Sequence, residues 1–583
     1  MISATSNLNT ALWQVTPDRI RLGLRRERKF AACGTRGNVA SLVLAATDSD
    51  GDRPAIARGG ADGQNLSHGE LQHEVTLLAD RLQEAGVLPG DRVAILVDAG
   101  PRWCTAFIAV VHIGAVAVPL DANLPLAELG KQLMHCGAEL ILLSASHELT
   151  AAGLTGKYSP GCRRLRVDDM SSPVAAAPSG PTAARLPCRR DNRDPAVICY
   201  TSGTTGCPKG VVVSHGNLIS QLMAIRIVMD NGPKTRVVSL LPPSHLFELT
   251  AGLLAVLAGG GSVFRTEQPT AQSVLDAMAH ARPTSMVVVP LFLSAVKSAI
   301  ERQLDAAGSL RRGLFLLLRK SALATRSMRL RRFLMWPLLR RFGGRLEYFV
   351  CGGAPLDTEL ARFFESLGVQ VLQGYGMTEA SPVVAANGPH SNRIGSVGRP
   401  LPGTEVRTSE EGEILVRGPQ VMLRYHRNVR ATAAAIDAEG WLHTGDLGEL
   451  DKDGYLYVNG RHSSRIVLAC GEKVQPEEVE TAILRSARIS ECGVIGMRSR
   501  SPLHNGSEEV CAVVVPTADD DPVDPRVLQQ ALRMEVSRCC AGLAQFKRPT
   551  RVIVRRQPLP ATASRKLRRR ALGAWLEQSG GNS

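Results

Sequence analysis

The chain has 583 residues, more than one hydrophobic core normally holds, so two or more domains are predicted. Apolar residues make up 44% and charged residues 21%, which excludes a wholly disordered protein. The net charge of +15 raises nucleic acid or an anionic membrane as a partner, but aromatic residues are only 4%. Because no nucleic-acid-binding motif accompanies the charge, a nucleic-acid partner is not expected.

The cysteines and the lengths of the apolar runs indicate in which cellular compartment the protein is expected. The 13 cysteines form no C-x-x-C pair, which argues against a zinc site and against a disulfide framework, and favours a reducing compartment. The first residues lack a basic segment followed by an apolar run, so no signal peptide is expected. No run of about 18 apolar residues is present. We therefore expect a cytoplasmic protein, with peripheral membrane association as an option.

Along the chain, residues 1–37 are expected to form a poorly ordered basic leader, followed by a large domain over 38–460. From about residue 41 to 144, helical patterns alternate with apolar runs such as Arg92–Val97, which predicts an α/β unit with parallel sheet. The segment 171–188 is rich in Ser, Pro and Ala and is predicted to be an exposed connection.

A second α/β stretch follows, with strands expected near Ala196–Tyr200, Val237–Leu241, Ser285–Pro290, Leu346–Cys351 and Val369–Gln373. After about Gly398, short strands and glycine turns predict a β-rich subdomain. Beyond a boundary near Gly460, we expect a small mobile α+β domain over 461–575 and a tail over 576–583. The predicted fold is thus α/β, with a large N-terminal domain of two α/β subdomains plus a β-rich subdomain.

The most informative segment is the glycine-rich stretch from Tyr200 to Gly210. Apolar residues on both sides predict a strand, a loop and a second strand. Glycines let backbone amides approach a ligand closely, hydroxyls add donors and Lys209 adds a positive charge, a combination suited to a triphosphate. The donors are Thr201, Ser202, Gly203, Thr204, Thr205 and Gly206. The spacing is not that of a Walker loop. A plain Ser/Thr/Gly turn in a hairpin is the alternative.

This stretch resembles the signature [YF]-T-S-G-T-T-G-x-P-K-G of the adenylate-forming superfamily, which comprises acyl-CoA synthetases, luciferases and adenylation domains of non-ribosomal peptide synthetases. The resemblance continues, in the family's order, over roughly residues 40–575. It implies ATP and Mg²⁺ as nucleotide and metal, a carboxylic acid as substrate, and CoA as acceptor.

The resemblance also implies roles for residues of four later motifs. In 242–247, His245 would sit beside the acyl and phosphate ends of the substrate as a catalytic residue. The adenine would pack on the turn with Gly353, Ala354 and Pro355 and stack on Tyr375. Gln373, Gly374 and Gly376 would belong to the same nucleotide site. Thr378 would contact the α-phosphate, while Glu379 and Thr201 would hold magnesium. Asp446 and Arg461 would bind the ribose. A carboxylate beside a polyphosphate is also, on chemical grounds, a natural Mg²⁺ ligand.

The C-terminal part matches the remaining motifs. Lys566, in Pro560–Arg569, would be the catalytic lysine that neutralises charge between the attacking carboxylate and the α-phosphate. A lysine in a basic tail is the alternative, because Arg565 stands where the family usually has glycine. Ser463 falls at the expected hinge, where charged residues are usual. Gly471 would line the thiol tunnel.

The spacing from Arg461 to Gly471 is one residue longer than in many short-chain and aryl relatives and is similar to that of long-chain acyl-CoA synthetases. We therefore expect a long-chain fatty acid–CoA ligase. One alternative is an acyl-AMP ligase that loads an acyl carrier protein, which basic patches would suit. Another is a degenerate paralogue that binds its ligands without turnover.

The stretch 311–345 carries eleven Lys or Arg and no acidic residue, with apolar runs among the arginines. This composition suits the surface of an anionic membrane. The alternative is a solvated helical insertion packed on the large domain.

Overall fold

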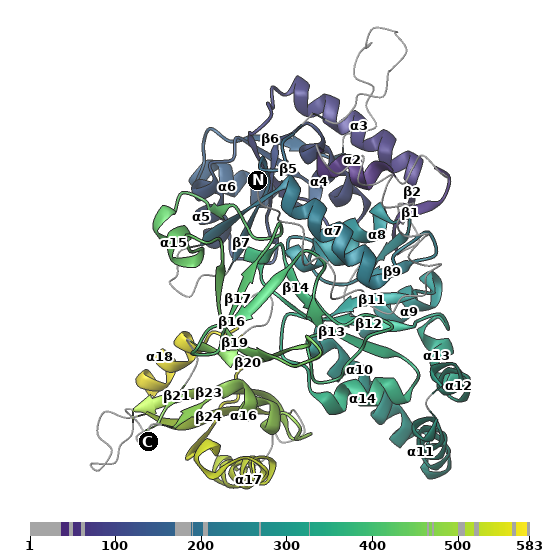
Figure 1. Cartoon of the computed structure of the whole chain (residues 1–583), viewed down its shortest axis with the longest axis vertical. Helices are drawn as coiled ribbons and strands as arrows, with labels where there is room; N and C mark the ends of the chain where they lie inside the picture. The colour runs from purple at the N-terminus through teal and green to yellow at the C-terminus, as the bar shows by residue number, and fades with distance from the viewer. Residues whose placement is uncertain are drawn as a thin grey trace, which may run out of the picture.

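The computed structural model describes residues 37–45, 51–59, 65–168, 188, 190–201, 208–266, 270–325, 327–462, 466–468, 472–498, 508–517, 524–561 and 567–579. These residues form a large α/β N-terminal domain and a smaller C-terminal domain at one end of it, as predicted (Figure 1). The expected leader, apart from its last residue, and almost all of the expected connection 171–188 lie outside the described residues.

The first sheet of the large domain has seven strands. Their order is β18 (Arg424–Tyr425), β8 (Lys209–Ser214), β7 (Pro195–Thr201), β4 (Val116–Pro119), β3 (Arg92–Leu96), β5 (Leu140–Leu143) and β6 (Arg163–Arg166). Strands β4, β3, β5 and β6 are parallel, whereas β8 runs antiparallel to β7. Every residue of β4 and β5 is buried, because parallel strands are covered on both faces.

The second sheet has nine strands, mostly parallel. Their order is β15 (Arg399–Pro400), β14 (Val383–Ala386), β13 (Gln370–Gly376), β12 (Tyr348–Cys351), β11 (Ser285–Val288), β9 (Arg236–Ser239), β10 (Ser262–Arg265), β1 (Pro54–Arg58) and β2 (Asn65–Ser67). The strands expected from the sequence in both sheets are confirmed to within a few residues.

The two sheets are not contiguous in sequence, and this corrects the expected division. Strand β1, from the first α/β stretch, pairs in parallel with β10 of the second sheet. Strand β7, expected in the second stretch, pairs in parallel with β4 of the first sheet. The local hydrophobic pattern identifies a strand but not its partner, which the crossover connections decide.

Helices connect the strands of both sheets. They are α2 (Val39–Leu44), α3 (His68–Glu84), α4 (Pro101–His112), α5 (Leu126–Cys136), α6 (Glu148–Lys157), α7 (His215–Met229), the π-helix η4 (Glu248–Leu254), α8 (Ala255–Ala258), α9 (Ala271–Ala281), α10 (Pro290–Ala306), α11 (Ser309–Ala324), α12 (Met328–Leu334), α13 (Trp336–Leu339) and α14 (Thr358–Ser366). Helix α3 illustrates why they form. Ser67 and Glu70 make a capping box, and Leu71, Val75 and Leu78 fall on one buried face.

The predicted β-rich subdomain is a four-stranded antiparallel sheet. It consists of β16 (Glu405–Thr408), β17 (Glu413–Arg417), β19 (Leu442–Leu450) and β20 (Leu456–Arg461), and α15 (Val429–Ala435) lies beside β18 and β19. Strand β17 has the bounds expected from the sequence. Its last strand, β20, leads directly into the smaller domain.

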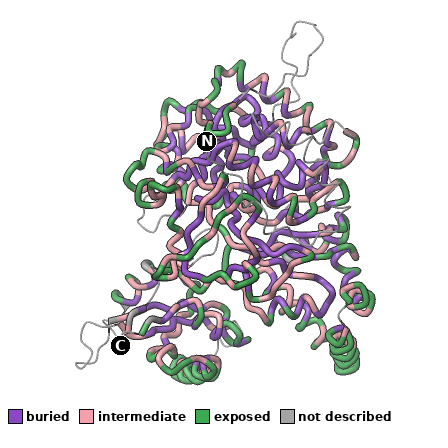
Figure 2. The backbone as a smooth tube through the Cα atoms, viewed as in Figure 1, coloured by how far each residue is buried: buried purple, intermediate pink, exposed green. Residues whose placement is uncertain are grey.

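The smaller domain has its own core. It contains β21 (Ile466–Val467), β22 (Lys473–Val474), α16 (Pro476–Ile483), β23 (Ile489–Arg498), β24 (Glu508–Pro516), α17 (Pro525–Cys539), β25 (Arg551–Val554) and α18 (Arg569–Ser579). Val494, Val514 and Leu528 meet in this core, which Figure 2 shows as a separate buried layer. Helix α18 continues past the expected end of the domain at 575, and Leu576 is buried, so residues 576–579 are part of the fold rather than a tail. The boundary near Gly460 stays a prediction.

Among the described residues, no helix has both the length and the apolar character needed to cross a bilayer.

Candidate active site

The hairpin β7–β8 frames the glycine-rich loop. Thr201 ends β7 and pairs with Lys209, the first residue of β8, so the two predicted strands are confirmed. The loop residues between them, Ser202, Gly203, Thr204, Thr205 and Gly206, lie outside the described residues. The Nζ atom of Lys209 lies 5.3 Å from the centre of the Tyr425 ring, an arrangement in which the ring face attracts the cation.

Glu379 lies in a short 3₁₀ turn, η6 (Thr378–Ala380), directly after β13. It is buried, and its Oε1 accepts a hydrogen bond of 2.8 Å from the Tyr425 hydroxyl. Burial, with the neighbouring Glu379 charge, raises the pKa of Tyr425, so that hydroxyl keeps its proton and donates it. Tyr425 thus connects the loop lysine to a carboxylate that is distant in sequence.

Sequence reasoning missed Tyr425, because the only signal is an aromatic residue in a two-residue strand, β18. That strand pairs antiparallel with β8, with Tyr425 opposite Val211, and this register brings the tyrosine beside the loop. No local pattern encodes such a register.

Asp446 links three segments of the large domain. Its Oδ2 accepts a 2.7 Å hydrogen bond from the Tyr375 hydroxyl, and its Oδ1 accepts a 2.8 Å bond from Nε of Arg461. The second contact follows from the strand pairing, because Asp446 lies opposite Arg461 in the β19–β20 ladder. The Asp446 side chain is 6% exposed, whereas that of Arg461 is 52% exposed. The buried Asp446 carboxylate therefore contacts the exposed Arg461 guanidinium through one oxygen and the Tyr375 hydroxyl through the other.

The Tyr375 hydroxyl remains protonated in this arrangement. Burial raises its pKa well above the ordinary value, and the charge of Asp446 acts in the same direction. The ring is therefore fixed at its tip by Asp446. A fixed, neutral aromatic ring is suited to stacking on a flat base.

Opposite this ring, β12 ends at Cys351 and the chain turns through Gly353, which has a φ of 83°, a conformation that favours glycine. Gly353, Ala354 and Pro355 are exposed. The Phe247 ring approaches to 3.2 Å of where a Cβ on Gly352 would lie, so the segment that carries His245 packs on this turn. His245 is half-buried, and its backbone N–H donates to the Pro242 carbonyl oxygen at 3.0 Å.

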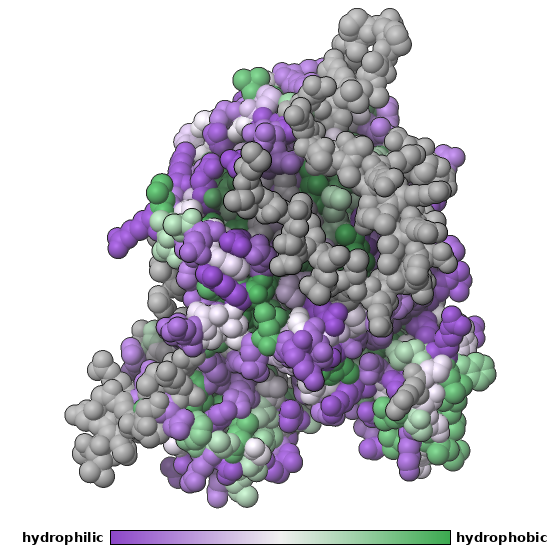
Figure 3. Space-filling model, viewed as in Figure 1, coloured by the Kyte–Doolittle hydropathy of each residue, from purple (hydrophilic) through white to green (hydrophobic). Residues whose placement is uncertain are grey.

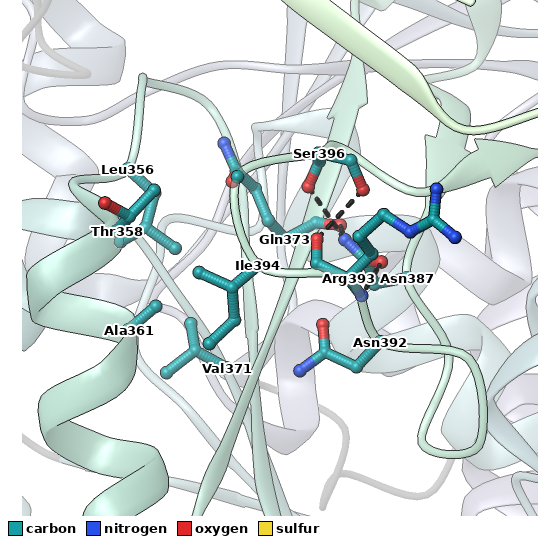
Figure 4. Close-up of a pocket in the computed structure, with 11 residues that line it drawn as sticks. Leu356, Thr358, Ala361, Val371, Gln373, Asn387, Asn392, Arg393, Ile394 and Ser396 are labelled. Carbon is teal, nitrogen blue, oxygen red and sulfur yellow. Dashed lines mark hydrogen bonds between the residues drawn. The ribbon is translucent and has the colours of Figure 1, made fainter. Parts of the chain in front are cut away.

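Gln373 lies at a shallow depression beside β13, which Thr358 and Ser396 also line. Figure 4 shows it between Thr358 and Ser396, and its carbonyl oxygen accepts a 3.1 Å hydrogen bond from the Asn387 amide. Asn387 also donates to the Ser396 carbonyl oxygen at 2.9 Å. These bonds fasten the loop 387–396 over the strand that carries Tyr375. Gly374 and Gly376 lie in the same strand.

Gly376 is expected to tolerate no side chain, because an added Cβ would lie 1.9 Å from the Pro382 carbonyl oxygen. Gly376→Ala should lower the free energy of unfolding by about 3 kcal/mol through overpacking. A denaturant titration measures this change. Gly374→Ala is the matched control, since its Cβ would lie 3.3 Å from the nearest atom, the Ala385 oxygen. Equal losses in both variants would contradict the steric explanation.

Glu248, three residues after His245, is a buried carboxyl group that sequence reasoning did not single out, although it is the lone acid in an apolar run. It begins η4, and its neighbours include Ser239 and Arg265. Burial raises its pKa to about 7, and the nearby Ser239 hydroxyl and the Arg265 charge oppose that shift. The group therefore gains or loses its proton near neutral pH.

The raised pKa of Glu248 predicts a pH-dependent stability. The stabilising effect of the protonated form is fully present below pH 4.5, the ordinary pKa, and is lost as the pH rises towards 7. Between these limits, the free energy of unfolding of the native chain should fall by about 3 kcal/mol relative to Glu248→Gln. Urea titrations of both proteins across this pH range measure the difference. A constant difference would contradict the assignment.

The described residues hold no group of three or more His, Cys, Asp or Glu that could form a protein-only metal site. Glu379 instead offers one buried carboxylate, and its partner Tyr425 also lies beside Lys209. A single carboxylate fits a magnesium ion, which commonly uses one or two carboxylates together with substrate phosphates. Lys566, Ser463 and Gly471 lie outside the described residues, and their roles stay predictions.

Family descriptions match both parts of the chain. The description "AMP-binding enzyme" matches residues 44–426, and "AMP-binding enzyme C-terminal domain" matches residues 478–566.

Among curated proteins, the chain is 32% identical to a feruloyl-CoA synthase of Amycolatopsis sp, covering 87% of this chain and 93% of that one. It is 29% identical to the long-chain-fatty-acid–CoA ligase FadD15 of Mycobacterium bovis, covering 79% and 80%. It is 27% identical to the chloroplastic long-chain-fatty-acid–[acyl-carrier-protein] ligase AEE15 of Arabidopsis thaliana, covering 85% and 78%.

Among solved structures, ATP-bound MatB from Rhodopseudomonas palustris superposes with a TM-score of 0.73 at 27% identity. The match covers 92% of this chain and 99% of that one.

Proposed function

Because the chain belongs to the AMP-binding enzyme family and is an acid–thiol ligase, we propose that it converts a long-chain fatty acid to its CoA thioester through an acyl adenylate. The observation that supports the proposal is the presence of two groups of contacting side chains. Lys209, Tyr425 and Glu379 form the first group, and Tyr375, Asp446 and Arg461 form the second. The first group suits a metal-bound triphosphate, and the second suits a nucleoside.

In the first half-reaction, a carboxylate oxygen of the acid attacks the α-phosphorus of ATP, and the bond to the β-phosphate oxygen breaks to release pyrophosphate. Tyr375 stacks on the adenine and Asp446 accepts from the ribose hydroxyls. Glu379 and Thr201 would hold Mg²⁺, which would neutralise phosphate charge. Thr378 and Lys566 stabilise charge at the α-phosphate, and His245 orients the acyl end.

In the second half-reaction, the CoA thiolate attacks the acyl carbonyl carbon, and AMP leaves with the electron pair of the broken C–O bond. We propose that the smaller domain rotates about Ser463 between the two steps. The rotation removes Lys566 and brings Gly471 to the thiol path. Hinged movements of this kind commonly limit turnover.

The long acyl chain is supported by the spacing from Arg461 to Gly471 and by the similarity to FadD15. An aromatic acid is the competing substrate, because a feruloyl-CoA synthase is also among the relatives. Transfer to an acyl carrier protein in place of CoA is the second candidate function, favoured by the similarity to AEE15. A cytoplasmic location with peripheral contact to anionic membranes is part of the proposal.

The test is pyrophosphate release with a panel of straight-chain acids from acetate to stearate and of aromatic acids, with and without CoA. Acyl-AMP and acyl-CoA are measured separately. Release that is greatest with the longest acids, with acyl-CoA accumulating, is the expected result. Greatest release with an aromatic acid would overturn the fatty-acid substrate. Acyl-AMP that accumulates despite CoA would point to a carrier protein, and no release with any acid would point to a degenerate paralogue.

A further inference from the structure

Helices α11, α12 and α13 form a projecting group at the edge of the large domain (Figure 1). Their outer sides are apolar to a degree unusual for a solvent-exposed surface, and Figure 3 shows hydrophobic residues gathered there. Leu310 is 87% exposed and Phe333 is 76% exposed, so neither belongs to a core. Large exposed apolar residues in this group include Leu310, Leu314, Leu317, Leu330, Phe333 and Trp336. A patch of this kind marks an interaction surface.

Helix α11 presents this patch in an ordered way. Leu310, Leu314 and Leu317 recur at intervals of four and three residues, which places them on one side of the helix. The opposite side contains Phe315, Leu318 and the buried Ala322. The helix is thus apolar on its attached side and also on its free side.

Three arginines fasten the group to the domain. Nε of Arg319 donates to the Ser366 hydroxyl at 2.9 Å, and its guanidinium lies 5.0 Å from the centre of the Phe363 ring. Nη1 of Arg331 donates to the Glu365 carbonyl oxygen at 3.3 Å, and Nη1 of Arg332 donates to the Gly368 carbonyl oxygen at 3.3 Å. The helices are therefore held in a fixed position, with the leucines and Phe333 still turned outward.

The other described cations of the group are exposed. They are Arg311, Arg312, Lys320, Arg329, Arg340, Arg341 and Arg345. No acidic residue occurs between Asp305 and Glu347. Among these seven described cations, Arg312 alone forms an ion pair, with its Nη1 2.9 Å from the Asp305 carboxylate. The apolar patch is thus bordered by positive charge.

We propose that α11, α12 and α13 form a docking surface for an anionic membrane, with Leu310, Leu314 and Phe333 among the acyl chains and the exposed cations on the lipid phosphates. An apolar helix face with flanking cations lies well in the plane of a bilayer surface. An acidic carrier protein would satisfy the arginines but would leave the protruding leucines and Phe333 without an apolar partner. A bilayer satisfies both.

The surface is also connected to the site. Helix α10 starts after Val289, whose Cγ1 lies 3.8 Å from where a Cβ on Gly353 would be, and ends two residues before α11. Its 17 residues span about 25 Å. A membrane on α11 would therefore lie one helix length from the turn at Gly353.

The experiment is co-sedimentation of the full chain with vesicles of phosphatidylcholine alone and of phosphatidylcholine with added phosphatidylglycerol, at moderate salt. One variant replaces charge, Arg311→Gln with Arg312→Gln and Lys320→Gln. Because each cation near an anionic surface contributes about fivefold to partitioning, this variant should bind the anionic vesicles on the order of 100-fold more weakly. A second variant, Leu310→Ser with Leu314→Ser and Phe333→Ser, should lose at least about tenfold.

The control is Leu149→Ser with Met534→Ser, two side chains that are 89% and 68% exposed on α6 and α17. It should bind like the native chain. Pyrophosphate release with a soluble short acid should be the same in all variants, which shows that they fold. Failure of the native chain to bind anionic vesicles, or binding of both triple variants as tight as that of the native chain, would overturn the proposal. A carrier protein that is bound in place of vesicles, with a loss only in the charge variant, would also overturn it. None of the vesicle-binding readouts depends on which acid the enzyme activates.

Discussion

Lys566→Gln is expected to slow acyl-AMP formation on the order of 10²–10³-fold, the usual cost of removing a group that stabilises transition-state charge. Thioester formation from supplied acyl-AMP and CoA should stay close to the native rate. In the proposed cycle Lys566 has left the site before the thiolate attacks, so the second step does not need its charge. Single-turnover measurements of each half-reaction, one started with ATP and acid and one with acyl-AMP, separate the two effects.

Lys547→Gln is the matched control in the same domain. Nζ of Lys547 lies 2.8 Å from the Glu478 carboxylate in an ion pair at the surface, and such pairs contribute about 0–1 kcal/mol. Both half-reactions should keep their native rates in this variant. Equal losses in both half-reactions of Lys566→Gln would contradict the role assigned to it and would favour a lysine needed only for folding.

Glu379→Gln should lower pyrophosphate release on the order of 10²–10³-fold at ordinary magnesium concentrations, and higher magnesium should recover part of the activity. Glutamine keeps the volume and can still accept from the Tyr425 hydroxyl, but it lacks the charge that attracts the metal. The loss should therefore appear mainly as weaker apparent magnesium binding. Initial rates across a magnesium titration at saturating ATP measure it.

Tyr425→Phe tests the contribution of the hydrogen bond to Glu379 separately from that of the Glu379 carboxylate itself. It removes the 2.8 Å hydrogen bond and leaves the carboxylate and the ring face near Lys209 in place. A hydrogen bond to a charged group contributes about 1.5–3 kcal/mol, so a loss on the order of 10–10²-fold is expected, smaller than that of Glu379→Gln. If the magnesium dependence of Glu379→Gln equalled that of the native enzyme, Glu379 would not be a metal ligand.

The strands, and the motifs that lie at the ends of several of them, could be predicted from the sequence. Apolar runs such as Arg92–Leu96 and Glu413–Arg417 are short, lie between turn residues and form strands where expected. Asp446 and Arg461, the residues proposed to bind the ribose, could be named from motifs, and the structure adds the register that makes them neighbours. In these places, local pattern and family order point to the same structure.

Other features depend on contacts between distant segments, which no local pattern encodes. Tyr425 reaches Glu379 because β18 pairs with β8, and β1 enters the second sheet because it pairs with β10. Glu248 acquires a raised pKa only after the sheet and η4 have closed around it. The eleven cations of 311–345 looked alike in sequence, yet the structure divides those it describes into three that fasten helices and seven that are exposed.

The position of Arg461 at the end of β20 has a thermodynamic consequence. This residue is both a partner of Asp446 and the last strand residue before the smaller domain begins. Any rotation of that domain that pulled Arg461 away from Asp446 would weaken nucleotide binding by a definite free energy. By reciprocity, a bound nucleotide must then oppose that rotation by the same amount. ATP, acyl-AMP and AMP would thus act as effectors of domain orientation as well as reactants, each according to how strongly it engages one arginine.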